Sequence, residues 1–506
     1  MKILKELSKI ITKRKVFNID IIDGNILKRK TSKLNKFYAG LINDQFQDDD
    51  DAAFYIYGST PADERYRQLK TRFRRRLLNT LFFLEVKTPA KPNYKKALMN
   101  CEREWALTQI LQLNNAQEVT YKLASNVFKT AKQYHFTNLL VESASLLRKI
   151  AAQKGDKTAF KTYNQYIHDY LPKREAEIQS EEALQWINQR YDQAIKKEKR
   201  DLLKEEIVPY CDQLISLSER YDAPIVNYNM FLIWSIRYEL QGDYEGMLEV
   251  CEQAEQYLNT HPYFYSLDKA TPIQIKKMSA YLHTKVFQGG KKIVEQNLNT
   301  IPSGSPSWFT LHEYYLLTAI HTENYISALA IYNRAAIHKN FKAIKGVEAK
   351  KWTVFEAYLH YFIQVKKLNA TISYDRKNRR FNLDQFLNNQ YSYSKEVVNL
   401  NVQLVTAQIL FLLEKQNLRE ISNKINHLCN YTLPHLKRNQ NQRTLYFVRL
   451  LQQLIRSGYD IDALIYKSRN LQRLQEIPFY YKGRAEELEI IPYEQCWQKI
   501  TMYLNN

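Results

Sequence analysis

Glycine and proline are scarce in this chain, which has 12 glycines and 13 prolines among its 506 residues. Average proteins contain roughly 7% glycine and 5% proline. Sandwiches, barrels and doubly wound sheets use both residues in frequent turns, whereas long helices joined by short loops need few of them. The scarcity therefore argues against those sheet folds. Since 45% of the residues are hydrophobic and 13% are aromatic, the chain can form a core and is not expected to be disordered.

Cysteines are also few, and long hydrophobic runs are missing. The five cysteines are far apart, odd in number and never spaced as C-x-x-C, so we predict free thiols in a reducing compartment. No run of about 18 uncharged apolar residues occurs that could span a membrane. Charged residues interrupt the apolar stretches near the N-terminus, so no signal peptide is expected. The sequence therefore predicts a cytoplasmic protein without a transmembrane segment.

The sequence also lacks the usual catalytic motifs. It contains no phosphate-binding glycine loop, no H-E-x-x-H, no G-x-S-x-G and no kinase signature. The ten histidines are dispersed, and His312 and His321 have no second ligand at metal spacing. The acidic run at residues 48–51 is expected to begin a helix, because four consecutive carboxylates point in different directions. We predict no enzymatic activity, no cofactor and no metal site; an unrecognised enzyme is the remaining alternative.

Apolar residues instead recur every three or four positions along most of the chain, which predicts an all-α protein. Three regions are expected: a basic helical N-terminal cap (residues 1–96), a helical repeat region (97–367) and a helical C-terminal region (368–506). A proline-containing linker at residues 86–96 marks the first boundary. Helix breaks are expected, among other places, near Pro172 and near Gly289–Gly290. The helix predicted at residues 395–415 is apolar on more than one face and should be central and buried.

Two segments within the repeat region share a pattern of small and aromatic residues. The first has Phe231, Trp234, Ser235 and Tyr238, followed by Met247 and Cys251. The second has His312, Tyr315, Leu316 and Ala319, followed by Ala328 and Tyr332. Nine positions separate Tyr238 from Met247 and also Ala319 from Ala328. Small residues let two helices cross closely while aromatic side chains fill the gaps between pairs.

This pattern, best matched over residues 228–341, resembles a degenerate form of the tetratricopeptide repeat (TPR) family. The resemblance implies an α-solenoid of stacked helix pairs; a non-repetitive helical bundle is the alternative. It also implies a concave groove that binds a peptide or a helix. The residues expected to face this groove are Asn229, Leu232, Ile236, Thr310, Glu313, Leu317 and His321. Family members that capture the carboxylate of a chaperone tail have Lys and Asn where this chain has Leu232, Ile236, Glu313 and Leu317, so that ligand is not expected.

Positive charge is concentrated near the N-terminus. The chain has a net charge of +21, and two segments, residues 1–36 and 61–100, each combine eleven basic with three acidic residues, a net +8 apiece. Within the helix expected after Pro61, arginines lie mostly off the face carrying Tyr66 and Phe73. Arginine side chains can clamp phosphate groups in a bidentate manner. The candidates for polyanion binding are Arg65, Arg72, Arg74, Arg75 and Arg76.

The sequence thus favours a non-enzymatic interaction or regulatory scaffold that binds another protein or peptide in the groove. The alternative is a basic α-helical protein that binds nucleic acid through its N-terminal cap. The arginines could equally be solvated surface residues, or they could pair with the carboxylates of residues 48–51.

Overall fold

The computed structural model describes residues 32–43, 45–82, 93–193, 197–297, 300–366, 382–388, 398–439, 442–461 and 468–505. Helices account for 83% of these residues, and none of them lies in a strand. Both observations confirm the predicted all-α fold. The first 31 residues and the core of the predicted linker, residues 83–92, lie outside the described part of the chain.

The chain divides into two compact units, residues 1–164 and 165–506. This division differs from the boundaries predicted near residues 96 and 367. The physical reason lies in the second unit, where one hydrophobic core runs from Met278 through Trp352 and Leu410 to Ile500. The predicted repeat region and the predicted C-terminal region therefore share a core and do not separate.

The first unit contains a small helical cluster at its N-terminal end. Phe37, Phe46, Tyr66 and Phe73 form its fully buried aromatic core. The acidic run begins a helix as predicted, because the Asp48 side chain accepts a hydrogen bond from the main-chain N–H of Asp51. In chain order the helices of this unit are α3 (Lys33–Ile42), α4 (Asp49–Tyr57), α5 (Glu64–Phe82), α6 (Tyr94–Leu113), α7 (Gln117–Tyr134), α8 (Thr137–Gln153) and the start of α9 (Lys157–Gln193).

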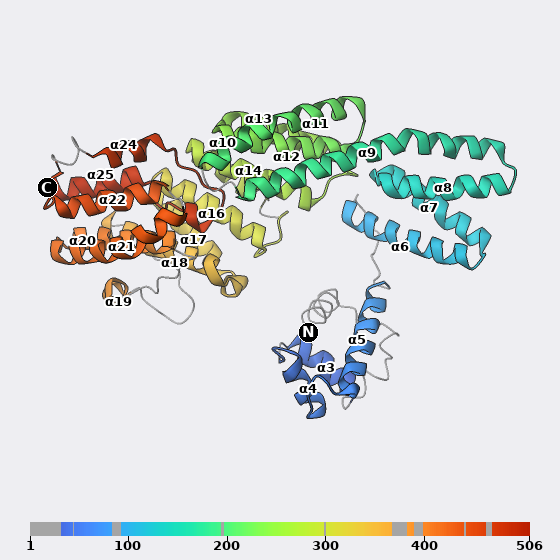
Figure 1. The fold of residues 1–506 in the computed structure, drawn as a ribbon, viewed down its shortest axis with the longest axis horizontal. Helices are drawn as coiled ribbons and strands as arrows, with labels where there is room; N and C mark the ends of the chain where they lie inside the picture. Colours follow the sequence, from blue (N-terminus) through green and yellow to red (C-terminus); the bar gives the residue numbers. More distant parts are fainter. Residues whose placement is uncertain are drawn as a thin grey trace. The chain divides into compact units, whose positions relative to one another are not determined.

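The second unit is built from helices that pack mainly on their neighbours in the chain (Figure 1). Its first helices after α9 are α10 (Lys197–Glu206), α11 (Val208–Arg220), α12 (Pro224–Gln241), α13 (Tyr244–Thr260), α14 (Leu267–Thr284), α15 (Phe287–Asn297), α16 (Pro306–His321), α17 (Tyr325–Ile337) and α18 (Gly346–Val365). Its later helices are α19 (Leu383–Asn388), α20 (Val398–Glu414), α21 (Leu418–Asn439), α22 (Gln442–Arg456), α24 (Arg469–Glu476) and α25 (Tyr493–Asn505), with short 3-10 turns η1 (Lys339–Ala343) and η3 (Ala485–Glu487).

Helix α20 is the centre of the C-terminal part of the second unit. Every residue from Val398 to Leu413 is buried, as the apolar pattern on several faces predicted. Helices α18, α21, α22 and α25 all contact it. A helix surrounded in this way must satisfy its polar side chains internally, because water cannot reach them.

The two segments with the shared pattern of small and aromatic residues each form two helices that pack on each other, α12 with α13 and α16 with α17. The small residues at the expected crossing points, Ser235, Ala254, Ala328 and Ala335, are at most 2% exposed. Glycine makes a similar close contact within two pairs. A Cβ on Gly246 would clash with the ring of Tyr238, and one on Gly289 would clash with the ring of Tyr281.

One predicted helix break is wrong, and another lies a few residues before its predicted position. Pro172 lies inside α9, which continues for 37 residues; a proline removes one main-chain donor and can bend a helix without ending it. Gly289 and Gly290 lie inside α15, and the preceding turn is made by Lys285 in the left-handed conformation, with φ 58°. The two glycines are therefore used for helix contact and not for a turn.

A tryptophan at position 328 tests the helix crossing in α17. Ala328 is fully buried, so Ala328→Trp should overpack the core and lower the free energy of unfolding by ~1–3 kcal/mol. Ile326 on the same helix is 69% exposed, and Ile326→Trp should change stability by less than about 0.5 kcal/mol. Chemical denaturation measures both; equal stability of the two variants would contradict the assigned crossing point.

Candidate functional site

An irregular segment of the second unit, residues 477–491, lies between α24 and α25 and contacts helices distant from it in sequence. We call it the internal segment. Eight of its hydrogen bonds join a side chain of a helix to a main-chain group of the segment. Most of this segment has no regular main-chain partners of its own, so buried helix side chains supply the hydrogen bonds that a strand or helix would make internally.

Tyr191 of α9 anchors the first part of the internal segment. Its main-chain oxygen accepts a hydrogen bond from the Lys482 ammonium at 2.6 Å, and that ammonium lies 3.9 Å from the centre of the Tyr191 ring. The guanidinium of Arg200 lies 4.5 Å from the ring centre of Tyr480. Phe479 packs against the rings of His283 and His321, with centroids 5.3 and 5.1 Å away. Aromatic and cation–π contacts thus position this stretch.

The side chain of Tyr481 contacts a buried ion pair formed by Lys351 and Glu313. The Lys351 ammonium lies 2.9 Å from both carboxylate oxygens of Glu313, and the Tyr481 hydroxyl donates to the same carboxylate. Lys351 also donates to the main-chain oxygen of Gly483 at 2.9 Å. Burial alone would lower the pKa of Lys351, but Glu313 and Glu348 outweigh it and raise that pKa. The ammonium therefore remains charged and shares its protons among three acceptors.

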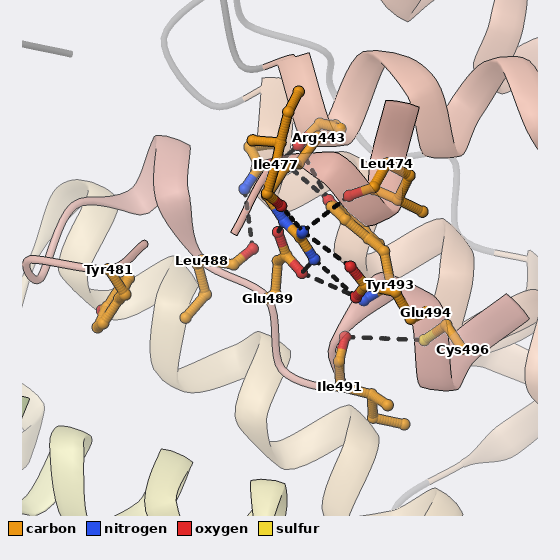
Figure 2. A network of polar contacts seen from close by, with 12 residues as sticks. Arg443, Leu474, Ile477, Tyr481, Leu488, Glu489, Ile491, Tyr493, Glu494 and Cys496 are labelled. Atoms are coloured by element: carbon orange, nitrogen blue, oxygen red, sulfur yellow. Dashed lines mark hydrogen bonds and ion pairs between the residues drawn. The ribbon is translucent and has the colours of Figure 1, made fainter. Parts of the chain in front are cut away.

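The second part of the internal segment is held by Arg443 of α22 (Figure 2). Its guanidinium contacts the Glu489 carboxylate at 2.6 and 2.9 Å and the Glu494 carboxylate at 2.8 and 2.7 Å. It also donates to the main-chain oxygens of Leu474 and Ile477. Burial raises the pKa of Glu489, while Arg443 opposes that rise. One arginine therefore joins both ends of the internal segment to α25.

Polar side chains of α20 and α16 complete the contact with the second part. Asn399 donates to the main-chain oxygens of Ala485 and Leu488 at 3.1 and 2.9 Å. Gln403 accepts from the Ile490 N–H at 3.2 Å. His321 Nε2 donates to the Glu489 main-chain oxygen at 2.9 Å, and burial lowers the pKa of His321 to about 4. The imidazole is therefore neutral at pH 7.

Most of the predicted groove residues are buried in the structure. Five are buried: Asn229, Ile236, Glu313, Leu317 and His321. Leu232 and Thr310 are half-buried. Glu313 and His321 contact the internal segment directly, whereas Asn229 donates to Ser180 of α9 at 3.0 Å. The expectation that all seven line an open groove is therefore not met, because other parts of the same unit cover these positions.

Two cavities remain open beside the covered residues. One, of about 440 Å³, includes Thr310 and Glu313 in its lining, together with Phe309, Glu348 and Trp352. The other, of about 190 Å³, lies at the start of the internal segment and is lined by Phe479 and Tyr480 together with α10 and α12 residues. Solvent therefore reaches both the predicted groove and the side chains that occupy part of it.

Several residues of this site were not predicted from sequence: Tyr191, Lys351, Arg443 and the internal segment itself. Two carried a signal. Lys351 falls on the helical face of Phe355, Tyr358 and Phe362, and Arg443 falls on that of Phe447, Leu451 and Leu454. A charged residue in register with buried apolar residues indicates a buried ion pair.

The polyanion candidates lie on α5 in the first unit. Arg72, Arg74 and Arg75 are exposed and Arg76 is half-buried; among the described residues, none of these four has an ion pair. Arg65 is engaged with Asp63, at 2.7 Å. The alternative pairing of arginines with residues 48–51 is not observed, since Lys70 and Tyr66 contact Asp49 instead, at 2.8 and 2.6 Å.

Within the described residues, no group of His, Cys, Asp or Glu side chains could hold a metal ion, and no helix is long and apolar enough to cross a membrane. All five cysteines are free and buried, as predicted. No protein-family model, curated protein or solved structure matches the chain.

Removing Arg443 tests the ion cluster. Arg443→Met leaves Glu489 buried without its partner, which should lower the free energy of unfolding by ~3–5 kcal/mol. Arg443→Met combined with Glu489→Leu should recover much of that loss, because the unpaired charge is then gone. Exposed Arg469 provides the control: Arg469→Met should change the denaturation midpoint little. A single variant as stable as the control would contradict the role given to Arg443.

Proposed function

We propose that this protein is a non-enzymatic interaction or regulatory scaffold whose second unit binds an extended peptide on the face formed by α9, α12, α14, α16 and α18. The observation that carries the proposal is the internal segment. It occupies this face as an irregular stretch whose main-chain groups are bound by helix side chains. A degenerate TPR-like array would supply such a face from the first helices of successive pairs.

The chemistry of the face suits a peptide better than a small metabolite. Its contacts are distributed along the internal segment from Phe479 to Ile490. They combine aromatic packing with side-chain donors and acceptors for peptide groups, which is how extended chains are usually recognised. Charged side chains on the face form ion pairs within the protein, for example Glu239 with Lys276. These charges therefore have partners before any ligand binds.

A peptide display selection tests this function. The full-length Tyr480→Ser/Lys482→Ser variant weakens the internal segment at two half-buried positions, so it should enrich peptides from a random library more strongly than the unaltered chain. An unaltered chain competes with its own segment, which lowers apparent affinity in proportion to the fraction that is open. Recovery of no peptide by either protein, with both shown to be folded by thermal melting, would count against the proposal.

A second function, binding of nucleic acid through α5, is favoured by one specific observation. Arg72, Arg74 and Arg75 are exposed on one helix and, among the described residues, have no carboxylate partner. Their face is separate from the apolar face of Tyr66, Phe73 and Leu77. A cationic stripe of this kind attracts phosphate groups without reading sequence.

The triple variant Arg72→Gln/Arg75→Gln/Arg76→Gln tests the second function. Each lost phosphate contact should reduce the slope of log affinity against log salt by about 0.9 on duplex DNA or about 0.7 on single strands. Stability should stay nearly unchanged, because exposed arginines contribute little to it. A matched variant of three exposed arginines in the second unit, Arg419, Arg469 and Arg473, should retain the full slope. Failure of the unaltered protein to bind at low salt would remove this function.

A further inference from the structure

The internal segment has two parts that differ in burial. In the first part, residues 477–484, only Tyr481 is fully buried; Pro478 is exposed and the other six residues are half-buried. The second part is residues 485–491. Its last four residues, Leu488 to Ile491, are at most 2% exposed, and all of them except Glu489 belong to the hydrophobic core. Release of the first part would therefore cost far less apolar burial than release of the second.

The first part is held by contacts of three consecutive side chains and by one main-chain conformation. Tyr480 lies under the Arg200 guanidinium, Tyr481 donates to Glu313, and Lys482 donates to the main chain of Tyr191. Gly483 follows with φ +87°, a conformation that residues with a Cβ rarely adopt. The recognised pattern is thus an aromatic residue, a tyrosine, a basic residue and a glycine.

The face would be left with unsatisfied groups if this part were removed. The His283 Nε2 atom accepts from the Tyr481 N–H at 3.2 Å while its Nδ1 donates to Ser279 at 2.7 Å. The Tyr191 main-chain oxygen would also lose the partner that Lys482 provides, whereas Lys351 would keep the carboxylates of Glu313 and Glu348. Buried polar groups without partners are costly, so this arrangement favours an occupant that supplies the same donors and acceptors.

The electrostatics of the first part do not distinguish its own basic residue from one supplied by another chain. Burial raises the pKa of Glu487 to about 7, and burial lowers the pKa of Lys482 to about 8. The Lys482 N–H donates to the Glu487 carboxylate at 3.0 Å, and the cavity of about 190 Å³ beside Phe479 and Tyr480 gives access to the start of this part. Burying a basic side chain on this face therefore costs electrostatic free energy. That cost is the same whether the side chain belongs to this chain or to another.

We propose that the partner of this face is an extended peptide with the sequence pattern aromatic–Tyr–Lys/Arg–Gly, which replaces residues 478–484 while Ile477, bonded to Arg443, and the second part of the internal segment stay anchored. The inference rests on the proposed peptide-binding function and adds the chemistry of the ligand. The chain's own Tyr480–Gly483 is then a resident competitor that a partner with the same pattern must displace.

The test uses a labelled synthetic peptide with the sequence of residues 476–486 and full-length protein. Fluorescence anisotropy should show this peptide binding the Tyr480→Ser/Lys482→Ser variant at least about tenfold more tightly than the unaltered chain, because the competitor is weakened. A peptide carrying Tyr481→Phe should bind about tenfold or more weakly, since it cannot donate to the Glu313 carboxylate. A scrambled peptide of the same composition is the matched control.

Each outcome decides between the ligand pattern and the function itself. If the scrambled peptide and the Tyr481→Phe peptide both bind as tightly as the unaltered 476–486 peptide, the pattern is overturned and peptide binding is left intact. So would a display selection that enriches peptides without the pattern while the 476–486 peptide fails to bind. If no peptide of either origin binds a folded variant, the proposed function fails together with the inference.

A second measurement covers the case in which the double variant does not fold. Saturating peptide added to the unaltered chain should speed hydrogen exchange at the amides of Tyr481 and Lys482, which are bonded to His283 and Glu487 in the resident state. Exchange at Ile490 in the anchored part should not change. Unchanged exchange at Tyr481 and Lys482 under saturating peptide would overturn the inference without requiring any substitution.

Discussion

The second unit depends on satisfying the main-chain polar groups of one irregular segment buried among helices. Helices satisfy their own N–H and C=O groups, but outside the short turn η3 residues 477–491 do not. A buried group left without a partner costs about as much as a lost hydrogen bond. Lys351, His321, Asn399, Gln403 and Arg443 supply those partners from four different helices. The polar residues inside this otherwise apolar core are explained by that requirement.

The same requirement explains why charges are buried here. A lone ammonium or guanidinium would be too costly in the core, so Lys351 is compensated by Glu313 and Arg443 by Glu489 and Glu494. Such pairs add little to stability compared with apolar residues of equal size. They do impose one geometry, because each cation must meet its carboxylate and its main-chain oxygen at once. We infer that they fix the position of the internal segment more than they strengthen the fold.

Local sequence patterns predicted the individual helices correctly, but they did not predict how distant helices and segments pack together. The turn at Gly242 and Asp243, the helix start at Asp48 and the buried character of α20 all follow from signals within a few residues. The division at residue 164 and the covering of Glu313 and His321 depend on contacts between residues more than a hundred positions apart. Periodicity identifies which face of a helix is apolar, but it does not identify which segment packs on that face. Gly289 is a local case: its close neighbour is Tyr281, eight positions earlier on the preceding helix, and the contact with that ring accounts for the glycine.

The contact between Tyr191 and Lys482 also has a consequence for biosynthesis. Its two residues are separated by 291 positions, and a ribosome adding about 5–20 residues per second needs roughly 15–60 s to make that length. During this interval α9, α12, α14, α16 and α18 emerge before the segment that will cover them exists. Tyr191, Glu313 and His321 are then accessible on the nascent chain. The face is thus available to other molecules, including chaperones, once during the synthesis of every copy, before its resident segment closes it.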